Sequence, residues 1–220
     1  MRYLAPADLL ADSRSGYASS VGVVETRSVS VCEGALDWTD CRRIIDAVDG
    51  APAVTGGVLR RGGDEVDLRL RSCTEHVIDP DAMRPVITAL AEIARRLHDI
   101  DGMRLDGPRF CRYTPGEYFR AHRDRSDDPA DPAAVRRREL SFICFLNGVD
   151  HAADLPAFDG GLLVMYLPQA DGSVAPLNIR PAAGTIVAFP SDVLHEVRPV
   201  REGVRYTAIA WLYSEGEGKL

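Results

Sequence analysis

His122 and Asp124 are two metal-binding residue types separated by one residue, at the end of the stretch YTPGEYFRAHRD (residues 113–124). The stretch predicts a strand over residues 117–124, and side chains two apart on a strand point to the same face of a sheet. Imidazole and carboxylate groups both bind divalent metals. A His-x-Asp pair also arises often by chance, and alone it is more often an ordinary surface pair. Its interpretation depends on what the rest of the chain supplies.

His195 is the candidate for a third ligand. It is one of five histidines, and it lies in FPSDVLHEVRPV, where a strand is predicted over residues 193–199. Alone, such a histidine is more often structural than a ligand. In a rolled-up sandwich, however, strands far apart in the sequence can face each other. Two neutral imidazoles and one carboxylate would then occupy one face of an octahedral ion, as in the facial triad of non-haem Fe(II) oxygenases.

Arg205 strengthens the case that His122, Asp124 and His195 form a binding site. It lies on a strand predicted over residues 204–213, after a turn that contains Gly203. A three-residue loop with a left-handed Gly203 would pair His195 with Ile209, whereas a two-residue loop would turn Arg205 to the opposite face. In the first register the inward face carries His195, Arg205, Thr207 and Trp211. An inward arginine is costly unless it meets an anion, either an internal carboxylate or a ligand carboxylate held with help from Thr207.

The elements that must position these residues follow from the hydrophobic pattern. Helices are predicted from Asp37 or Thr39 to Gly50 and from about Asp79 to about Ile100, because apolar residues recur there at helical spacing. A loop or hairpin is predicted over 50–66. Strands are predicted over 29–34, 66–73, 107–113, 117–124, 139–147, 161–167, 174–180, 184–190, 193–199 and 204–213. Two helices followed by about eight strands predict a two-sheet sandwich or jelly roll with helices covering one sheet.

The composition limits the possible functions. The chain has 220 residues, a net charge of −7 and a pI of about 5.3, so it offers no basic footprint for nucleic acid or for an anionic membrane. It has no apolar run of membrane-spanning length and no signal-peptide core, which makes a cytoplasmic location the expectation. Five scattered cysteines without a C-x-x-C pair predict reduced thiols rather than a disulfide framework or a structural zinc site.

From about Arg109 to Tyr213 the chain resembles the 2-oxoglutarate- and Fe(II)-dependent dioxygenases, in particular the prolyl 4-hydroxylase-like branch. The motifs that carry the resemblance occur in the family order: RYTPGEYFRAHRD, LSFICFLN, FDGGLLVMY, PAAGTIVAF, VLHEVRPV and VRYTAIAWL. The resemblance implies a double-stranded β-helix, or jelly roll, with N-terminal helices packed on its major sheet. We expect one domain over residues 1–220, in which residues 1–105 support a catalytic core over residues 106–214.

The resemblance also implies roles for individual residues. It assigns metal ligation to His122, Asp124 and His195, and it assigns the distal carboxylate of 2-oxoglutarate to Arg205. Further contacts to the cosubstrate, or walls of its pocket, are implied for Tyr113, Thr207, Phe145, Leu163 and Trp211. The implied cofactors are Fe(II), 2-oxoglutarate and O₂, with ascorbate as a candidate reductant for the iron. Because Asp124 is present, the resemblance implies hydroxylation rather than halogenation.

The substrate is the least determined part. The polar insert over residues 125–139 is a candidate lid, and candidate substrate contacts are Arg136, Arg137, Arg138 and His151, although exposed charges of this kind are more often solvated surface. We expect a small-molecule substrate, an amino acid or a biosynthetic intermediate, and a monomer or homodimer. The alternatives are a hydroxylase of peptidyl or free proline and a non-catalytic protein that binds metal or 2-oxoglutarate. A zinc hydrolase would leave Arg205 without a role.

Overall fold

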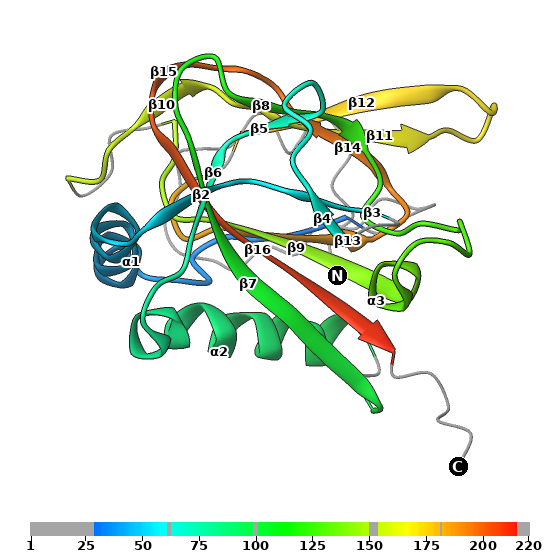
Figure 1. Ribbon diagram of the computed structural model, residues 1–220, viewed down its shortest axis with the longest axis horizontal. Helices are drawn as coiled ribbons and strands as arrows, with labels where there is room; N and C mark the ends of the chain where they lie inside the picture. Colours follow the sequence, from blue (N-terminus) through cyan, green and yellow to red (C-terminus); the bar gives the residue numbers. More distant parts are fainter. Residues whose placement is uncertain (1–28, 61–62, 99–100, 150–153, 181, 215–220) are drawn as a thin grey trace.

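Two antiparallel sheets face each other and form a jelly roll, as the sequence predicts (Figure 1). The computed structural model describes residues 29–60, 63–98, 101–149, 154–180 and 182–214. The major sheet has the strand order β1 (Ser30–Cys32), β13 (Ile186–Pro190), β9 (Arg138–Phe145), β16 (Arg205–Ser214), β7 (Met103–Tyr113), β6 (Thr74–His76) and β2 (Ala53–Thr55). The minor sheet has the order β12 (Val174–Ile179), β11 (Leu163–Pro168), β14 (Leu194–Val197), β8 (Tyr118–His122) and β5 (Arg71–Ser72). Two short pairs join β10 (Phe158–Gly160) to β15 (Val200–Gly203) and β3 (Val58–Arg60) to β4 (Gly63–Glu65).

Two helices cover the outer face of the major sheet, which confirms the predicted layer (Figure 1). Helix α1 (Trp38–Gly50) begins after Asp37, whose carboxylate accepts a hydrogen bond from the Asp40 amide. Helix α2 (Pro80–Leu97) begins after Asp79, whose side chain accepts from the Asp81 amide. Both caps satisfy amides that have no partner inside the helix. No helix in the described part of the chain is long and apolar enough to cross a membrane.

Strand β9 separates two cores. Phe142 and Cys144 pack toward the helices, while Ile143 and Phe145 pack toward the minor sheet. Because successive side chains on a strand point to opposite faces, a strand covered on both sides must be apolar throughout. The sequence LSFICFLN meets this requirement, so the second core fills the space between the sheets and sets their separation.

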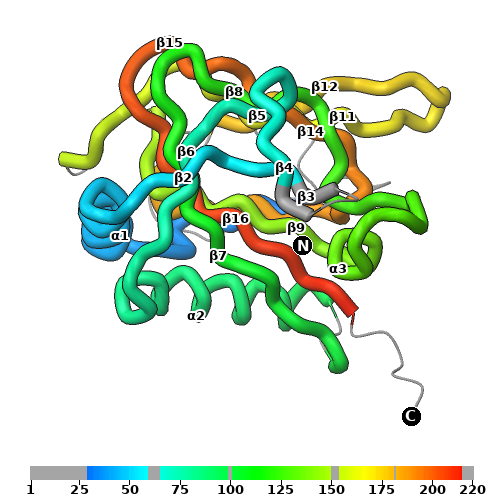
Figure 2. Tube along the Cα trace, viewed as in Figure 1, coloured from blue at the N-terminus to red at the C-terminus, as the bar shows by residue number. Residues whose placement is uncertain are grey.

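The strand predicted over residues 66–73 is largely wrong. Residues 68–70 form a turn in which the Asp67 carbonyl accepts hydrogen bonds from the amides of Leu70 and Arg71. The Asp67 carboxylate accepts a third, from the Arg69 amide, so this local turn replaces a strand ladder. After it the chain enters the minor sheet as β5 and leaves for the major sheet as β6, so it crosses between the sheets at Cys73 (Figure 2).

The hairpin that was expected to pair His195 with Ile209 is also wrong. Strand β14 pairs with β11 and β8, whereas β16 pairs with β7 and β9 in the other sheet. Between them the chain forms β15 and crosses from the minor to the major sheet, and Gly203 has the expected left-handed conformation at φ 72°. His195 and Arg205 both face the interior, but from opposite sheets. The sequence analysis reached this shared orientation through a wrong register.

Gly184 and Gly172 form a matched pair for testing backbone packing, because each has φ +80°. A Cβ on Gly184 would lie 2.1 Å from the backbone oxygen of Leu36, whereas a Cβ on Gly172 would meet nothing within 4 Å. We expect Gly172→Ala to cost about 1–2 kcal/mol of unfolding free energy, the strain of the left-handed conformation alone. Gly184→Ala should cost clearly more, because the backbone before α1 must also move. Equal losses in urea denaturation would contradict this account.

Candidate metal centre and anion pocket

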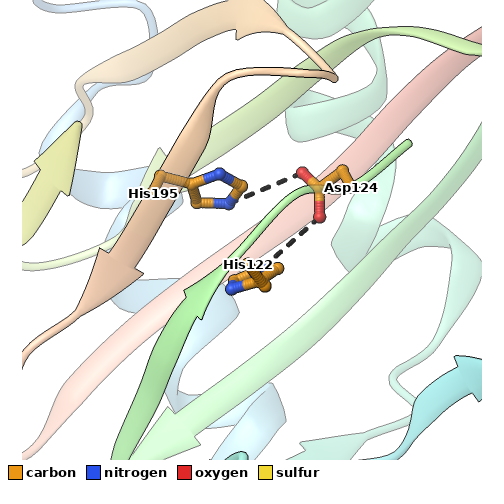
Figure 3. Close-up of side chains that lie close together, drawn as sticks. All are labelled: His122, Asp124 and His195. Atoms are coloured by element: carbon orange, nitrogen blue, oxygen red, sulfur yellow. Dashed lines mark ion pairs between the residues drawn. The ribbon is translucent and has the colours of Figure 1, made fainter. Parts of the chain in front are cut away.

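His122, Asp124 and His195 come together between the sheets (Figure 3). One potential ligand atom from each lies within 4.8 Å of the other two. His122 is the last residue of β8, and its Cα is the cross-strand partner of His195 on β14. Asp124 was expected on the same strand as His122, but it lies two residues beyond the strand end, where its amide donates to the Ser191 carbonyl. The three side chains therefore come from two adjacent strands of the minor sheet and the turn that follows one of them.

A β-bulge in β8 aims His122 into the interior. The pairing of β14 with β8 shifts by one residue between His195–His122 and Val197–Phe119. Without the shift, Phe119 and His122 would lie three positions apart on a regular strand and would point to opposite faces. Instead their rings stack, with centroids 3.5 Å apart and planes inclined by 13°. The bulge thus places an aromatic ring directly against the first candidate ligand.

Both imidazoles are held in the same tautomer. The Nδ1 atom of His122 lies 2.8 Å from the Arg120 carbonyl oxygen, and the Nδ1 atom of His195 lies 2.9 Å from the Val193 carbonyl oxygen. A carbonyl oxygen only accepts hydrogen bonds, so each Nδ1 must carry the proton. In the neutral form each Nε2 then presents a bare lone pair, and this is the form in which histidine binds a metal.

The lone pairs face a buried carboxylate. Nε2 of His122 lies 3.5 Å from Oδ1 of Asp124, and Nε2 of His195 lies 3.6 Å from Oδ2 (Figure 3). Burial, reinforced by His122, lowers the pKa of His195 to about 4, so this imidazole is neutral at pH 7. Burial alone would raise the pKa of Asp124, but His195, His122 and Ser141 outweigh it and hold that pKa below its usual range. Electron pairs on three sides of one small space fit a cation between them.

Arg205 is a buried cation that lacks a carboxylate partner among the described residues. Its side chain is 1% exposed, and its Nη1 lies 3.4 Å from the Thr207 hydroxyl. Its guanidinium lies over the rings of Tyr113 and Phe145, at 5.1 and 4.9 Å from their centroids. Nε and Nη2 have no hydrogen-bond partner. Because an unpaired buried guanidinium is costly, this side chain is complementary to a bound anion that would take both free N–H groups.

A small cavity is lined both by the three candidate ligands and by Arg205. Its other walls include Tyr113, Thr207, Ile209 and Trp211, of which the sequence analysis singled out all except Ile209. Phe145 lies beneath the guanidinium of Arg205, and Leu163 lies in the core between the sheets without lining the cavity. The cavity therefore connects the metal centre to the arginine, so one small ligand can contact both.

The three arginines of the insert have different surroundings. Arg138 turns inward: it is 5% exposed, its Nη2 lies 3.1 Å from Asp106, and its guanidinium lies 3.6 Å from the ring centroid of Trp211. Arg136, the last residue of the short helix α3 (Ala133–Arg136), donates to the Asp131 carbonyl, and Arg137 is exposed. Only Arg138 is therefore beside the cavity wall. His151 lies outside the described residues.

The sequence analysis missed two residues near His122, namely Phe119 and Arg71, of which Phe119 also lines the cavity. Phe119 stacks on His122. The buried Arg71 lies over the Phe119 ring, with its guanidinium carbon 5.0 Å from the ring centroid. The run RLRS around Arg71 looks like a solvated strand, and nothing in one sequence distinguishes a buried arginine there from an exposed one. The bulge in β8 that brings Phe119 against His122 has no reliable sequence signal either.

Sequence comparison places this geometry in a known family. Residues 108–213 match the model of the 2OG-Fe(II) oxygenase superfamily. A PKHD-type hydroxylase of Sphingopyxis alaskensis is 35% identical over 111 residues, which make up 50% of this chain and 45% of that relative. A PKHD-type hydroxylase of Bordetella pertussis is 36% identical over 108 residues, 49% of this chain and 43% of the relative. The chain thus spans less than half the length of these curated relatives.

Solved structures agree with the sequence comparison. A prolyl-4-hydroxylase from Pseudomonas putida superposes with a TM-score of 0.65 at 25% identity, covering 87% of this chain and 95% of that one. A prolyl hydroxylase from Trichoplax adhaerens, solved with a hypoxia-inducible-factor peptide fragment, has a TM-score of 0.66 at 18% identity, covers 87% of this chain and 86% of that one, and supports the fold alone. Over residues 108–213, just under half of its length, the chain is similar to the 2OG-Fe(II) oxygenase superfamily, and the proteins it resembles include members of the prolyl 4-hydroxylase-like branch.

The buried His195 predicts a pH-dependent stability of the metal-free protein. Its pKa is about 4 when folded and about 6.5 when unfolded, so between these values the unfolded chain binds more protons. Stability should therefore be complete above about pH 6.5 and should fall toward pH 4, by up to about 3 kcal/mol. Urea denaturation at pH 7 and pH 4.5 measures the effect, and His195→Gln should show a smaller difference. An unchanged difference in the variant would contradict the assignment.

Arg205 predicts opposite effects on stability with and without an anion. Arg205→Met removes a buried charge, so the ligand-free protein should be equally stable or more stable by about 1–2 kcal/mol. The wild type should gain about 2.7 kcal/mol from 2-oxoglutarate at one hundred times its Kd, and the variant should gain nothing at that concentration. Urea denaturation with and without 2-oxoglutarate measures both effects. A large loss of stability in the ligand-free variant would show that Arg205 already has a structural partner.

Proposed function

We propose that the protein is an Fe(II)- and 2-oxoglutarate-dependent hydroxylase that acts on an unactivated C–H bond. One observation carries the proposal: two imidazole lone pairs and a carboxylate converge at one side of a cavity, and at its other side lies a buried arginine for which the described residues provide no counter-ion. A divalent metal and a dicarboxylate would satisfy both groups at once. Bound Fe(II), 2-oxoglutarate and O₂ would supply the oxidation, with succinate and CO₂ as the other products.

The residues of the chain then have separable tasks. His122, Asp124 and His195 would hold the metal and leave its remaining positions open to the cavity. Arg205, assisted by Thr207 and Tyr113, would bind the distal carboxylate of 2-oxoglutarate through its free N–H groups. The apolar walls, among them Ile209 and Trp211, would exclude water from the reacting atoms.

For the substrate we propose an amino acid or a small biosynthetic intermediate. The cavity is small and is lined mainly by apolar side chains, which suits a small molecule. A prolyl residue or free proline is the second candidate, because solved prolyl hydroxylases share this fold over most of their length. We also propose that residues 1–105 support the core over 106–214 within one domain, since β2 and β6 continue the major sheet.

Anaerobic metal loading tests the proposal most directly. With Fe(II) and 2-oxoglutarate the protein should develop a weak visible charge-transfer band, because the ligand chelates a metal held by the three residues. His122→Ala and His195→Ala should lose the band and succinate formation, and Arg205→Ala should need at least about a hundredfold more 2-oxoglutarate. His98→Ala is the control, since His98 lies outside the cavity. No band in fully folded, loaded wild type would refute the proposal.

Substrate classes can be separated by mass spectrometry. Amino acids, small carboxylates and proline-containing peptides would be incubated with the loaded protein, and products that gain one oxygen would be sought. Succinate release that depends on one class identifies it. A protein that shows the charge-transfer band but releases no succinate with any class would be a binding protein rather than an enzyme.

A further inference from the structure

We propose that Arg71 is a positioning residue for His122 and that it acts through the ring of Phe119. The inference deepens the proposed function, because it rests on His122 being a metal ligand. It concerns a side chain that contacts neither the cavity nor the other candidate ligands. Phe119 links the other two groups, because the Arg71 guanidinium lies over its ring and this ring stacks on the His122 imidazole.

The guanidinium of Arg71 is fixed from several segments at once. Arg71 is 3% exposed, and its Nη1 lies 2.6 Å from the Glu75 carboxylate and 2.7 Å from the Gly57 carbonyl. Its Nη2 donates to the Cys111 sulfur at 3.1 Å. These contacts join β6, the segment after β2 and the central strand β7. The guanidinium therefore has little freedom to move relative to the major sheet.

Phe119 is in direct contact with this fixed guanidinium. Its Cα is the cross-strand partner of the Arg71 Cα in the pairing of β5 with β8, so the two side chains are neighbours on adjacent strands. The guanidinium lies 5.0 Å from the ring centroid, within the range of a cation–π contact. In this buried place the contact is stronger than at a surface, and it restricts the ring rotation that a phenylalanine otherwise retains.

His122 is then oriented by two constraints that act at right angles. The hydrogen bond from Nδ1 to the Arg120 carbonyl lies in the plane of the imidazole, whereas the Phe119 ring lies against its face at 3.5 Å. The first sets which edge of the imidazole faces the site, and the second sets the tilt of the plane. A metal ligand must satisfy both to aim its Nε2 lone pair, and partners of this kind influence metal affinity strongly.

A purely structural role explains the arrangement less well. A buried ion pair such as Arg71–Glu75 is often no more stabilising than apolar residues of similar volume, so packing alone does not require the charges. An arginine, in contrast with an apolar residue, holds a planar donor group against an aromatic face while hydrogen-bonding at its edge. Arg71 does both at once, since it lies over the Phe119 ring and contacts Glu75 and Gly57 at its edge.

Cobalt(II) binding tests the proposal without catalysis. The informative variants are Arg71→Met combined with Glu75→Gln, which removes the ion pair without leaving a buried charge, and Phe119→Leu, which removes the stack. Each should raise the Kd for Co(II) about tenfold and should alter the visible absorption of the bound ion, because His122 is no longer held at one tilt. His98→Ala, which lies outside this cluster and outside the cavity, is the control and should match the wild type. Arg71→Lys should restore part of the affinity.

The outcomes separate this inference from the proposed function. If the wild type binds no Co(II), the assignment of the metal centre is wrong, and both this inference and the proposed function are refuted. If the wild type binds Co(II) while both informative variants match its affinity and spectrum, only the role of Arg71 and Phe119 is refuted. Lower urea stability with an unchanged spectrum and affinity would show a merely structural role and would also refute it. Should the double variant not fold, Phe119→Leu alone decides by the same two readouts.

Discussion

The pairing of His195 with His122 across β14 and β8 is the contact on which the site depends. It brings residues that are far apart in sequence to neighbouring positions in the minor sheet. The bulge in the same strand pair turns His122 inward, and the turn that follows brings Asp124 to the same place. Two carbonyl oxygens then decide which nitrogen of each imidazole is bare. The backbone of the minor sheet thus sets where the three donor groups lie and which nitrogen of each imidazole is bare.

Three buried guanidiniums surround this centre, and their differences are informative. Arg71 has the Glu75 carboxylate, and Arg138 has the Asp106 carboxylate. Arg205 lies over two aromatic rings and has two N–H groups without a partner. Charges that serve the architecture are compensated inside the fold, because an uncompensated one costs several kcal/mol. The one that is not compensated is therefore the one most plainly shaped for a ligand.

The sequence predicted much of the fold and the residues that meet at the site, but not the geometry that joins them. The capped helices were predictable because Asp37 and Asp79 precede apolar stripes at helical spacing, and β9 because it is apolar on both faces. The hairpin between β14 and β16 was wrong, since local turn chemistry cannot show that a chain changes sheets. The prediction of a strand over 66–73 was wrong because Asp67 accepts hydrogen bonds from three nearby backbone amides and forms a local turn. Phe119 could not be predicted as a contact of His122 because a β-bulge brings the two together. Arg71 could not be predicted because its sequence context does not show that it is buried.

The crossing at Cys73 has a consequence for any attempt to divide the protein. Strand β5 covers the edge of the minor sheet at β8, and β6 covers the edge of the major sheet at β7, so one short segment closes both sheets on the same side. A fragment beginning near residue 106 would carry all three candidate ligands and Arg205, yet it would expose two open strand edges. Unpaired edges of this kind promote association between chains. Residues 71–76 thus cover a strand of each sheet, and a truncated core would expose those two strands and would tend to associate.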